Sequence, residues 1–600
     1  MPSTHGVPDR TYDYRATQLY LLGRVQMKLK RKVIAVVGVL ALSTTAVAFI
    51  NPASAATPAS WIGPVPAQAG AVKGGTVTII NQGDFEHLDP ARNYVGGTLD
   101  FYRLFVRTLT SVRTVKGVTE LVPDLAEDLG TTKDGGQTWV FKLRSGIQYE
   151  DGSLVTCDDI KYGVARSYED GTLDGGPTYA QDLLANGNAY KGPYTTPTKD
   201  LESVVCSNDG ASITFKLANK VPYFAYVTTY GAFSPVPQEK DTKQNYDLRP
   251  VSTGPYKIET YDRGKQLTLV RNKYWDPASD PIRWNYPDKF VAKFGSDQNV
   301  IENTLISDSG EAKTSLSMDT NIVTNLQKVS TDAKYKSRFF AIASPYARYY
   351  TINVDTVKDV NVRKAIQCAF DFKQILIAAG GTTAGTINPS TIPSNVKGAY
   401  RAFTVCDRDV TKHPEAQVAA AKAYLAKAKV KKTNLVLAYR DKGVEPQRAA
   451  ALQQELEAVG FTVTMSKYPR AGYYSQVSKR GVPNEPDIVQ ASWAYDWAAA
   501  SGVVYALFDG RTMTPTDARQ NYSRANFPDL TALFIKADKS PTAIQEKILG
   551  DIEQNLVQVK AAHLNIYFEN SAYMGGSKLG GLQLDGGFST LSPLGAWVKK

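Results

Sequence analysis

Residues 433–466 read TNLVLAYRDKGVEPQRAAALQQELEAVGFTVTMS, and this stretch decides the fold class. The segments NLVLAY and TVTM have the composition of strands, and VEPQRAAALQQELEAVGF between them has that of a helix. A strand, a helix and a second strand within about thirty residues predict a βαβ unit, whose strands lie parallel in one sheet. The stretch therefore predicts an α/β fold with a parallel sheet in the C-terminal half.

The composition describes a globular chain of several domains. With 600 residues the chain is too long for one core, and domains of about 100–200 residues predict three or four of them. Hydrophobic residues make up 43% and charged residues 21%, which excludes a disordered or collagen-like chain. The net charge is +11, but lysine and arginine are scattered, which indicates solubility and no nucleic-acid partner.

The one long apolar run, VIAVVGVLALSTTAVAFI at 33–50, follows the basic segment MKLKRK at 27–32. A single run excludes a multi-span permease. The small-residue site Ala53-Ser54-Ala55 comes next, and this order is the pattern of a secretory signal peptide cut before Ala56. Because eighteen residues are long for a cleaved signal, an uncleaved membrane anchor remains a rival interpretation.

The N-terminal region thus divides into three predicted parts. Residues 27–55 are the signal peptide, residues 1–26 are interpreted as a mis-assigned start, and residues 56–71 form a solvated Pro-, Ala- and Gly-rich leader. The protein is therefore expected to be exported to the outer face of the cytoplasmic membrane or an equivalent periplasmic space.

The cysteines are even in number and all lie in the exported part: Cys157, Cys206, Cys368 and Cys406. An oxidising compartment favours two disulfides, for which three connectivities are possible. We expect Cys157–Cys206 and Cys368–Cys406, taking each pair to fall within one domain. Four buried thiols are the alternative.

Residue sets typical of catalysis or metal binding are absent from the sequence. The chain has four histidines, none with HExxH spacing, and it contains no GxSxG, GxxxxGK[ST] or CxxC motif. The sequence therefore favours a binding protein that is no enzyme, with no cofactor and no metal site.

Other local patterns predict individual elements. Thr156 and Asp159 have the spacing of a capping box and predict the start of a helix. The predicted strands are TVTII from Thr76, residues 139–143 and 212–217, and a hairpin with YKIETY and QLTLVRN on either side of a DRGK turn. Residues 361–379 predict one amphipathic helix.

Five segments in a consistent order carry a family resemblance. They are GGTVTIINQGDFEHLDPARNY (74–94), VPDLAEDLGTTKDGGQTWVFKLRSGIQYEDGSLVTCDDIKYGVARS (122–167), STGPYKIETYDRGKQLTLVRNKYW (252–275), NVRKAIQCAFDFKQIL (361–376) and VEPQRAAALQQELEAVGFTVTM (444–465). Together they resemble the extracellular solute-binding proteins of family 5, which serve peptide, opine and nickel ABC importers. The stretch around Trp493 is most similar to actinobacterial peptide-binding members.

The resemblance implies an α/β fold of the type II periplasmic-binding-protein kind, a two-lobed Venus flytrap with an extra domain inserted in lobe I. The boundaries it implies are 72–111, 200–313 and 564–600 for lobe I, 112–199 for the inserted domain and 314–563 for lobe II. The strands that join the lobes are expected to cross near 346–354 and 564–569.

The resemblance also implies a ligand site. In peptide-binding members a Trp-x-x-Asp unit follows a lobe II strand, and Trp493-Ala494-Tyr495-Asp496 matches it after DIVQASW. Asp496 would hold a peptide α-amine by charge-assisted hydrogen bonds, and Trp493 and Trp497 would form walls for ligand side chains. The alternative is an aromatic core cluster in which Asp496 caps the next helix.

The predicted site includes further candidate residues and one position that differs from the family pattern. Tyr94 lies in a loop that lines the cleft in the family, and Tyr473 and Tyr474 lie in lobe II. Gln490 stands three residues before Trp493, where some relatives place a cation for the ligand carboxylate. This departure argues against tight recognition of a peptide C-terminus.

The function that these patterns favour is capture of short peptides for ABC import. The expected partners are a short peptide, ABC permease subunits and their ATPase, with membrane contact only through the permease or an uncleaved signal, and the chain is expected to act as a monomer. The alternatives are another cargo on the same fold (a nickel chelate, an opine or an oligosaccharide), a peptide-sensing receptor subunit, or a secreted enzyme, which no residue set supports.

Overall fold

The computed structural model describes residues 63–600, except 116, 117, 170, 174, 186–188, 395, 397, 431, 442 and 470–472. The predicted mis-assigned start, the signal peptide and residues 56–62 of the leader lie outside the described residues. Within the described part of the chain, no helix is both long enough and apolar enough to cross a membrane.

The first lobe is built on a sheet with strand order β10-β1-β9-β8-β7. Its strands are β1 (Thr76–Ile80), β7 (Tyr256–Asp262), β8 (Gln266–Arg271), β9 (Lys289–Lys293) and β10 (Ser315–Leu316). β1 pairs in parallel with β9 and β10, and β7 and β8 form an antiparallel hairpin. The predicted strand from Thr76 and the predicted hairpin are confirmed.

A small domain has a sheet of its own, with strand order β4-β6-β5. Its elements are β4 (Thr138–Lys142), β5 (Val204–Cys206), β6 (Ser212–Lys216), α3 (Cys157–Arg166), α4 (Tyr179–Leu183) and α5 (Phe224–Val227). The predicted capping box begins α3: the Thr156 side chain accepts from the Asp159 N–H, and the Asp159 carboxylate accepts from the Thr156 N–H. Because β5 and β6 complete the sheet of β4, the small domain extends past residue 199, where the sequence-based boundary ended it.

The second lobe contains a mixed sheet with strand order β12-β16-β11-β15-β13-β14. The predicted βαβ unit is confirmed as β13 (Asn434–Arg440), α11 (Glu445–Val459) and β14 (Thr462–Tyr468), with β13 and β14 parallel. β15 (Ile488–Trp493) also runs parallel to β13. The carboxyl ends of these three strands therefore lie at the same edge of the sheet, the edge where α/β sheets place their ligand sites.

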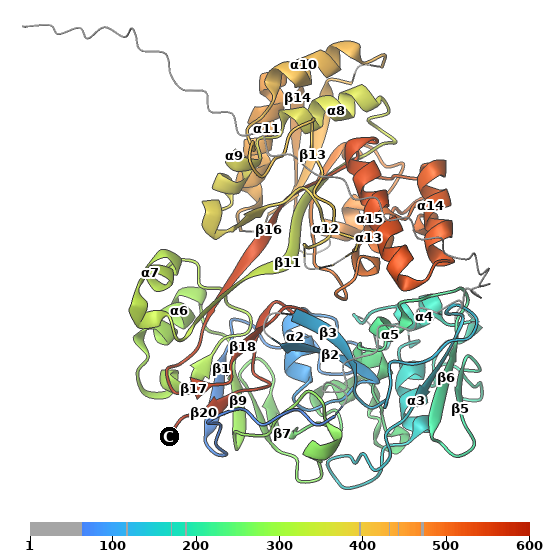
Figure 1. Cartoon of the computed structure of the whole chain (residues 1–600), viewed down its shortest axis with the longest axis vertical. Helices are drawn as coiled ribbons and strands as arrows, with labels where there is room; N and C mark the ends of the chain where they lie inside the picture. The colour runs from blue at the N-terminus through green and yellow to red at the C-terminus, as the bar shows by residue number, and fades with distance from the viewer. Residues whose placement is uncertain are drawn as a thin grey trace, which may run out of the picture. The chain divides into compact units, whose positions relative to one another are not determined.

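Two long antiparallel strands, β11 (Phe339–Ile352) and β16 (His563–Met574), join the lobes (Figure 1). In the second lobe, β11 pairs with β15. In the first lobe, Met574 at the end of β16 packs against helix α6 (Gln298–Ser307). The sequence-based boundary at residue 313 differs from this arrangement, since β10 pairs with β1 and residues 322–335 pack against α6.

The remaining elements cover these sheets or connect them. The helices are α2 (Gly96–Tyr102), α7 (Leu326–Thr331), α8 (Val360–Ala369), α9 (Phe372–Ala378), α10 (Val418–Lys427), α12 (Tyr473–Val477), α13 (Ser501–Phe508), α14 (Pro528–Asp538) and α15 (Thr542–Gln558). The strands are β2 (Thr110–Val115), β3 (Val118–Pro123), β12 (Gly385–Ile387), β17 (Leu579–Gly580), β18 (Gln583–Asp585), β19 (Thr590–Ser592) and β20 (Trp597–Val598). The single helix predicted over 361–379 is wrong, because α8 ends at Ala369 with Phe370 extended, and Asp371 caps the new helix α9 by accepting from the Gln374 N–H at 2.9 Å.

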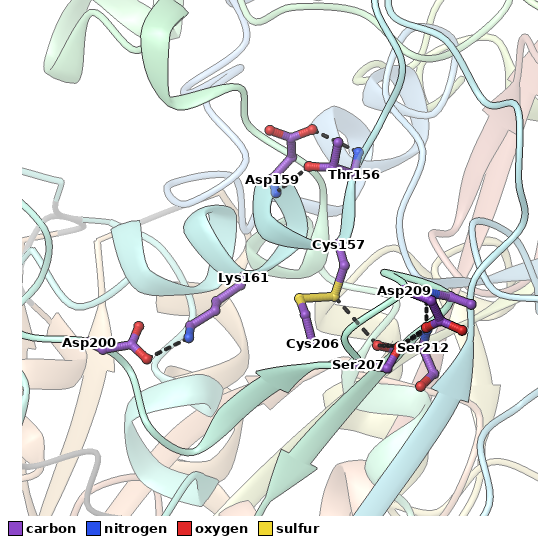
Figure 2. The surroundings of a disulfide bond; sticks show 10 residues. Thr156, Cys157, Asp159, Lys161, Asp200, Cys206, Ser207, Asp209 and Ser212 are labelled. Atoms are coloured by element: carbon purple, nitrogen blue, oxygen red, sulfur yellow. Dashed lines mark hydrogen bonds and ion pairs between the residues drawn. A yellow bond between two sulfur atoms is a disulfide. The ribbon is translucent and has the colours of Figure 1, made fainter.

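Both expected disulfides are confirmed. Cys157 at the start of α3 is bonded to Cys206 at the end of β5, with 5.9 Å between their Cα atoms (Figure 2). Cys368 in α8 is bonded to Cys406, with a Cα distance of 5.2 Å. The first bridge fastens a helix to the small sheet, and the second fastens a second-lobe helix to the loop that precedes α10.

Candidate functional site

Asp496 lies on a tightly held loop at the carboxyl end of β15. The Asp496 N–H donates to the Gly502 carbonyl at 3.3 Å, and the Trp493 indole donates to the same oxygen at 3.0 Å. Glu546 on α15 accepts from the Ala500 N–H at 2.9 Å, one residue before α13 begins. The helix is thus anchored by Glu546, which leaves the Asp496 carboxylate available for other contacts.

Three tyrosines from the other side of the cleft meet Asp496. Its carboxylate accepts from the Tyr94 hydroxyl at 3.0 Å and from the Tyr179 hydroxyl, and its backbone carbonyl accepts from the Tyr230 hydroxyl at 2.9 Å. Tyr94 precedes α2, Tyr179 opens α4 and Tyr230 follows α5, whereas Asp496 belongs to the second lobe. The carboxylate therefore sits in a hydrogen-bond network that spans the two lobes.

Burial governs the electrostatics of Asp496. It raises the pKa of this carboxyl to about 6, while hydrogen bonds from Tyr179, Tyr94 and Tyr230 oppose the rise. Within the described part of the chain, no lysine, arginine or histidine forms an ion pair with Asp496. A buried carboxylate without a cation is unstable in its charged form, and a cationic ligand group would supply the missing charge.

Aromatic side chains surround this carboxylate. Trp497 is buried, and its ring stacks on Tyr223 with centroids 5.3 Å apart and meets the edge of Tyr179 at 5.4 Å. The Trp497 indole donates to the Ser501 hydroxyl at 2.8 Å. The second lobe thus inserts one indole into the aromatic core of the small domain, so Trp497 is both a core residue and a wall of the site.

A cavity of about 30 Å³ adjoins Asp496. Its wall includes Leu99 of α2, Trp497 and Phe588, which lies in the turn between β18 and β19. The same turn touches the second lobe directly, because the Tyr495 hydroxyl donates to the Gly586 carbonyl at 2.7 Å. The C-terminal turn is therefore part of the interlobe site.

The structure brings some of the predicted site residues together and leaves one apart. Asp496, Tyr94 and Trp497 lie around the cavity network, and Trp493 holds the loop through its indole. Tyr473 lies instead in the core of the second lobe, where its hydroxyl donates to the Gln490 carbonyl at 2.7 Å.

Sequence reasoning missed Tyr179, Tyr230 and Phe588. The chain has 34 tyrosines, and no local signal separates these two from the others.

Among the residues that the structure describes, no group of three or more His, Cys, Asp or Glu side chains could hold a metal ion.

Comparison with known proteins identifies the family that this sequence resembles. The sequence profile of bacterial extracellular solute-binding proteins, family 5 Middle, matches residues 120–515. The oligopeptide-binding protein OppA of Bacillus subtilis is 27% identical over 176 residues, which are 27% of this chain and 31% of that protein. The chain thus matches less than a third of the length of this curated relative and of OppA from Salmonella typhimurium.

Solved structures extend the similarity over nearly the whole described chain. The clavulanic acid biosynthesis oligopeptide binding protein 2 is 25% identical, with a TM-score of 0.80 over 90% of this chain and 100% of that one. The binding protein DppA of Helicobacter pylori, in complex with the peptide STSA, has a TM-score of 0.66 at 18% identity over 88% of this chain and 99% of that one. These neighbours are two-lobed binding proteins of the predicted type.

Proposed function

This chain belongs to the bacterial extracellular solute-binding proteins of family 5, and from that premise we propose that it captures short peptides between its lobes for import. Members of the family are the substrate-binding components of ABC importers, and its relatives and fold neighbours are binding proteins rather than enzymes. Peptide cargo, a permease and its ATPase as partners, and export to the cell surface are parts of the proposal.

The observation that carries the proposal is the Asp496 carboxylate, which lies between the lobes and has no cationic partner among the residues that the structure describes. An ionised carboxylate offers about four acceptor positions, and two are used by the Tyr94 and Tyr179 hydroxyls. A peptide α-ammonium has three donors and a positive charge, so it matches the remaining positions and relieves the burial of the negative charge. The amino end of a peptide is the ligand group that this site fits.

Binding and lobe closure are coupled in this proposal. The tyrosines around Asp496 come from before β11 and Asp496 comes from after it, so a ligand bound there contacts both lobes. A ligand that makes such contacts only when the lobes meet shifts the population toward the closed form. The closed form would then be the one that a permease distinguishes from the empty protein.

A non-peptide cargo is the main alternative, and the site makes a cationic or amine-bearing ligand the better fit. An oligosaccharide could donate hydroxyls to Asp496 but would bring no positive charge, and a chelate that presents only carboxylates would need a different anchor, since an ionised Asp496 offers only acceptors. Gln490 cannot hold a ligand carboxylate as a cation would, and it is buried, donating to the Tyr350 hydroxyl at 2.9 Å.

A thermal-shift series with di- to hexapeptide pools tests the proposal, each pool supplied free and N-acetylated. A ligand at a hundred times its dissociation constant adds about 2.7 kcal/mol to stability, which is a measurable shift. We expect free peptides to stabilise the protein and acetylated ones to have no effect, and Asp496→Asn to abolish the difference. Asp441→Asn is the matched control, because Asp441 pairs with the exposed Lys467 at the surface.

The outcomes separate two questions. Equal shifts from free and acetylated pools would keep a peptide ligand and discard the role of Asp496. No shift from any pool, with folded protein freed of co-purified ligand, would overturn the peptide proposal.

A further inference from the structure

We propose that the cavity beside Asp496 selects cargo whose first residue has a small, uncharged side chain. This inference rests on the proposed function, since it assumes that a peptide α-amine binds Asp496. It adds a specificity that the anchor alone does not give, because every peptide with a free amino end could reach the carboxylate.

The lining of the cavity is the first reason. Apolar surface comes from Leu99, Val112, Ala498 and the ring of Phe588, and neutral hydroxyls come from Thr119 and Thr229. Of the residues that line the cavity, all within the described part of the chain, Asp496 alone is charged. A ligand amine would use that charge, so a second charged group in the cavity would have no counter-ion.

The guanidinium of Arg103, behind the Phe588 wall, is already neutralised. Arg103 packs over the Phe588 ring, 4.9 Å from its centroid, on the side away from open solvent. Its Nη1 lies 2.8 Å from Asp585 and 3.2 Å from Asp100, both of which are buried. Arg103 therefore supports the turn that carries Phe588, and its positive charge is balanced by the carboxylates of Asp585 and Asp100.

The size of the cavity is the second reason. About 30 Å³ holds one or two water-sized groups, which suits the side chain of alanine or a slightly larger one. The walls leave little room to enlarge it: Phe588 is backed by Arg103, and the ring of Trp497 is fixed between Tyr223 and Tyr179. A bulky first side chain would have to displace one of these rings.

The rim that the small domain contributes is the point where this specificity can be changed. Thr119 on β3 lies against the turn that carries Phe588, because a Cβ built on Gly587 would be 3.5 Å from its methyl group. Its hydroxyl is within hydrogen-bond distance of the Thr114 hydroxyl, at 2.9 Å. A carboxylate at position 119 would give a cationic first side chain the counter-ion that the cavity lacks.

Calorimetric titration of the purified full chain with free tripeptides Xaa-Ala-Ala tests the inference, with Ala, Val, Asp, Lys or Trp at Xaa. We expect Ala and Val to bind about tenfold to a hundredfold more tightly than Asp, Lys and Trp, because each of these brings an unpaired charge or a ring that does not fit. Thr119→Glu should restore binding of Lys-Ala-Ala, and Thr119→Gln, the neutral control of the same shape, should not.

Each result distinguishes the cavity from the anchor. Equal affinity for all five peptides, or preference for Lys or Asp first, would overturn the inference and leave the peptide function standing. If no tripeptide binds while longer free peptides do, the cavity does not read the first residue and the inference is wrong. If no free peptide of any length binds, the proposed function fails and the inference falls with it.

Discussion

At the scale of single residues, the proposed binding chemistry depends on a carboxylate held in an unfavourable environment. Asp496 is kept from full hydration by aromatic rings and is met only by neutral hydroxyls in the described part of the chain. Such a group destabilises the ligand-free protein when it is charged, and a bound cation gains affinity because it offsets the buried negative charge. Affinity and stability are therefore expected to change in opposite directions at this position.

Replacing Asp496 by asparagine should stabilise the ligand-free protein near neutral pH. The pKa of Asp496 is about 6 in the folded chain and about 3.9 in an unfolded one, so the folded chain holds this proton more tightly. The stability that this proton confers is present below about pH 4 and is lost as the pH rises to about 6. We expect thermal unfolding to show Asp496→Asn more stable than wild type by about 3 kcal/mol at pH 7.5, with no gain at pH 3.5.

The control for this experiment is Asp441→Asn, whose carboxylate is exposed and paired with Lys467. It should not show the same gain at pH 7.5. A constant difference between wild type and Asp496→Asn across the whole pH range would contradict the burial of a titrating carboxylate.

Peptide affinity should depend on pH through the same group. Only the ionised carboxylate pairs with an ammonium, so protonation of Asp496 competes with binding. Below about pH 6 we expect the dissociation constant to rise about tenfold for each pH unit, to be lowest near pH 7, and to rise again toward pH 8 as the peptide α-amine, with a pKa of about 7.7–8.0, loses its proton. Calorimetry of a free tripeptide between pH 4.5 and 8 measures this, and a flat profile would exclude Asp496 as the anchor.

The residue scale also shows the limit of sequence reasoning about the site. Asp496 and Trp493 could be found because their spacing is a local motif directly after a strand. Tyr179 reaches the Asp496 carboxylate, and Tyr230 the Asp496 backbone carbonyl, from segments that are 317 and 266 residues away. Their role depends on tertiary placement, which no local pattern records.

At the scale of elements, periodicity and capping predicted much of the fold. The βαβ unit, the β7–β8 hairpin and the start of α3 follow from signals within a few residues. The break between α8 and α9 was missed because apolar spacing continues across it, while the competing signal is the single cap Asp371. The extent of the small domain was missed because β5 joins β4 through β6, a pairing between distant segments.

Helix α3 offers a prediction about packing between elements. A Cβ placed on Gly163 would lie 2.0 Å from the Ser234 carbonyl oxygen, so this helix approaches the backbone there as only glycine allows. Alanine in a helix is ordinarily about 1 kcal/mol better than glycine. We expect Gly163→Ala instead to destabilise the protein by about 2 kcal/mol or more, measured by urea unfolding.

Gly83→Ala is the comparison for this experiment, since a Cβ at Gly83 would have no neighbour within 4 Å. It should leave the unfolding midpoint nearly unchanged. A neutral or stabilising Gly163→Ala would show that α3 can move away from Ser234.

At the scale of the whole molecule, two crossing strands and a few direct contacts relate the lobes. The Tyr495 hydroxyl of the second lobe donates to the Gly586 carbonyl of the C-terminal turn at 2.7 Å. We expect Tyr495→Phe to reduce the closed population and to weaken peptide binding about threefold to tenfold, because one interlobe hydrogen bond is lost. Resonance energy transfer between dyes on the two lobes, together with calorimetry, measures both effects.

Tyr256→Phe is the matched variant for this test, because the Tyr256 hydroxyl also donates to a backbone carbonyl, that of Pro287, within the first lobe. It should change stability without changing the transfer efficiency. Identical effects of the two variants would mean that the Tyr495 contact has no part in closure.

Residues 579–596 complete the core of the first lobe, and this affects the order in which the protein can fold during its synthesis. Arg103 finds its partner Asp585 only 482 residues later, and the core around β1 includes Leu591, Leu594 and Ala596. The N-terminal segments therefore keep apolar surface uncovered until residues 579–596 have been synthesised. A chain that stops before residue 579 lacks this cover, so premature termination should produce a target for proteases rather than a shortened binding protein.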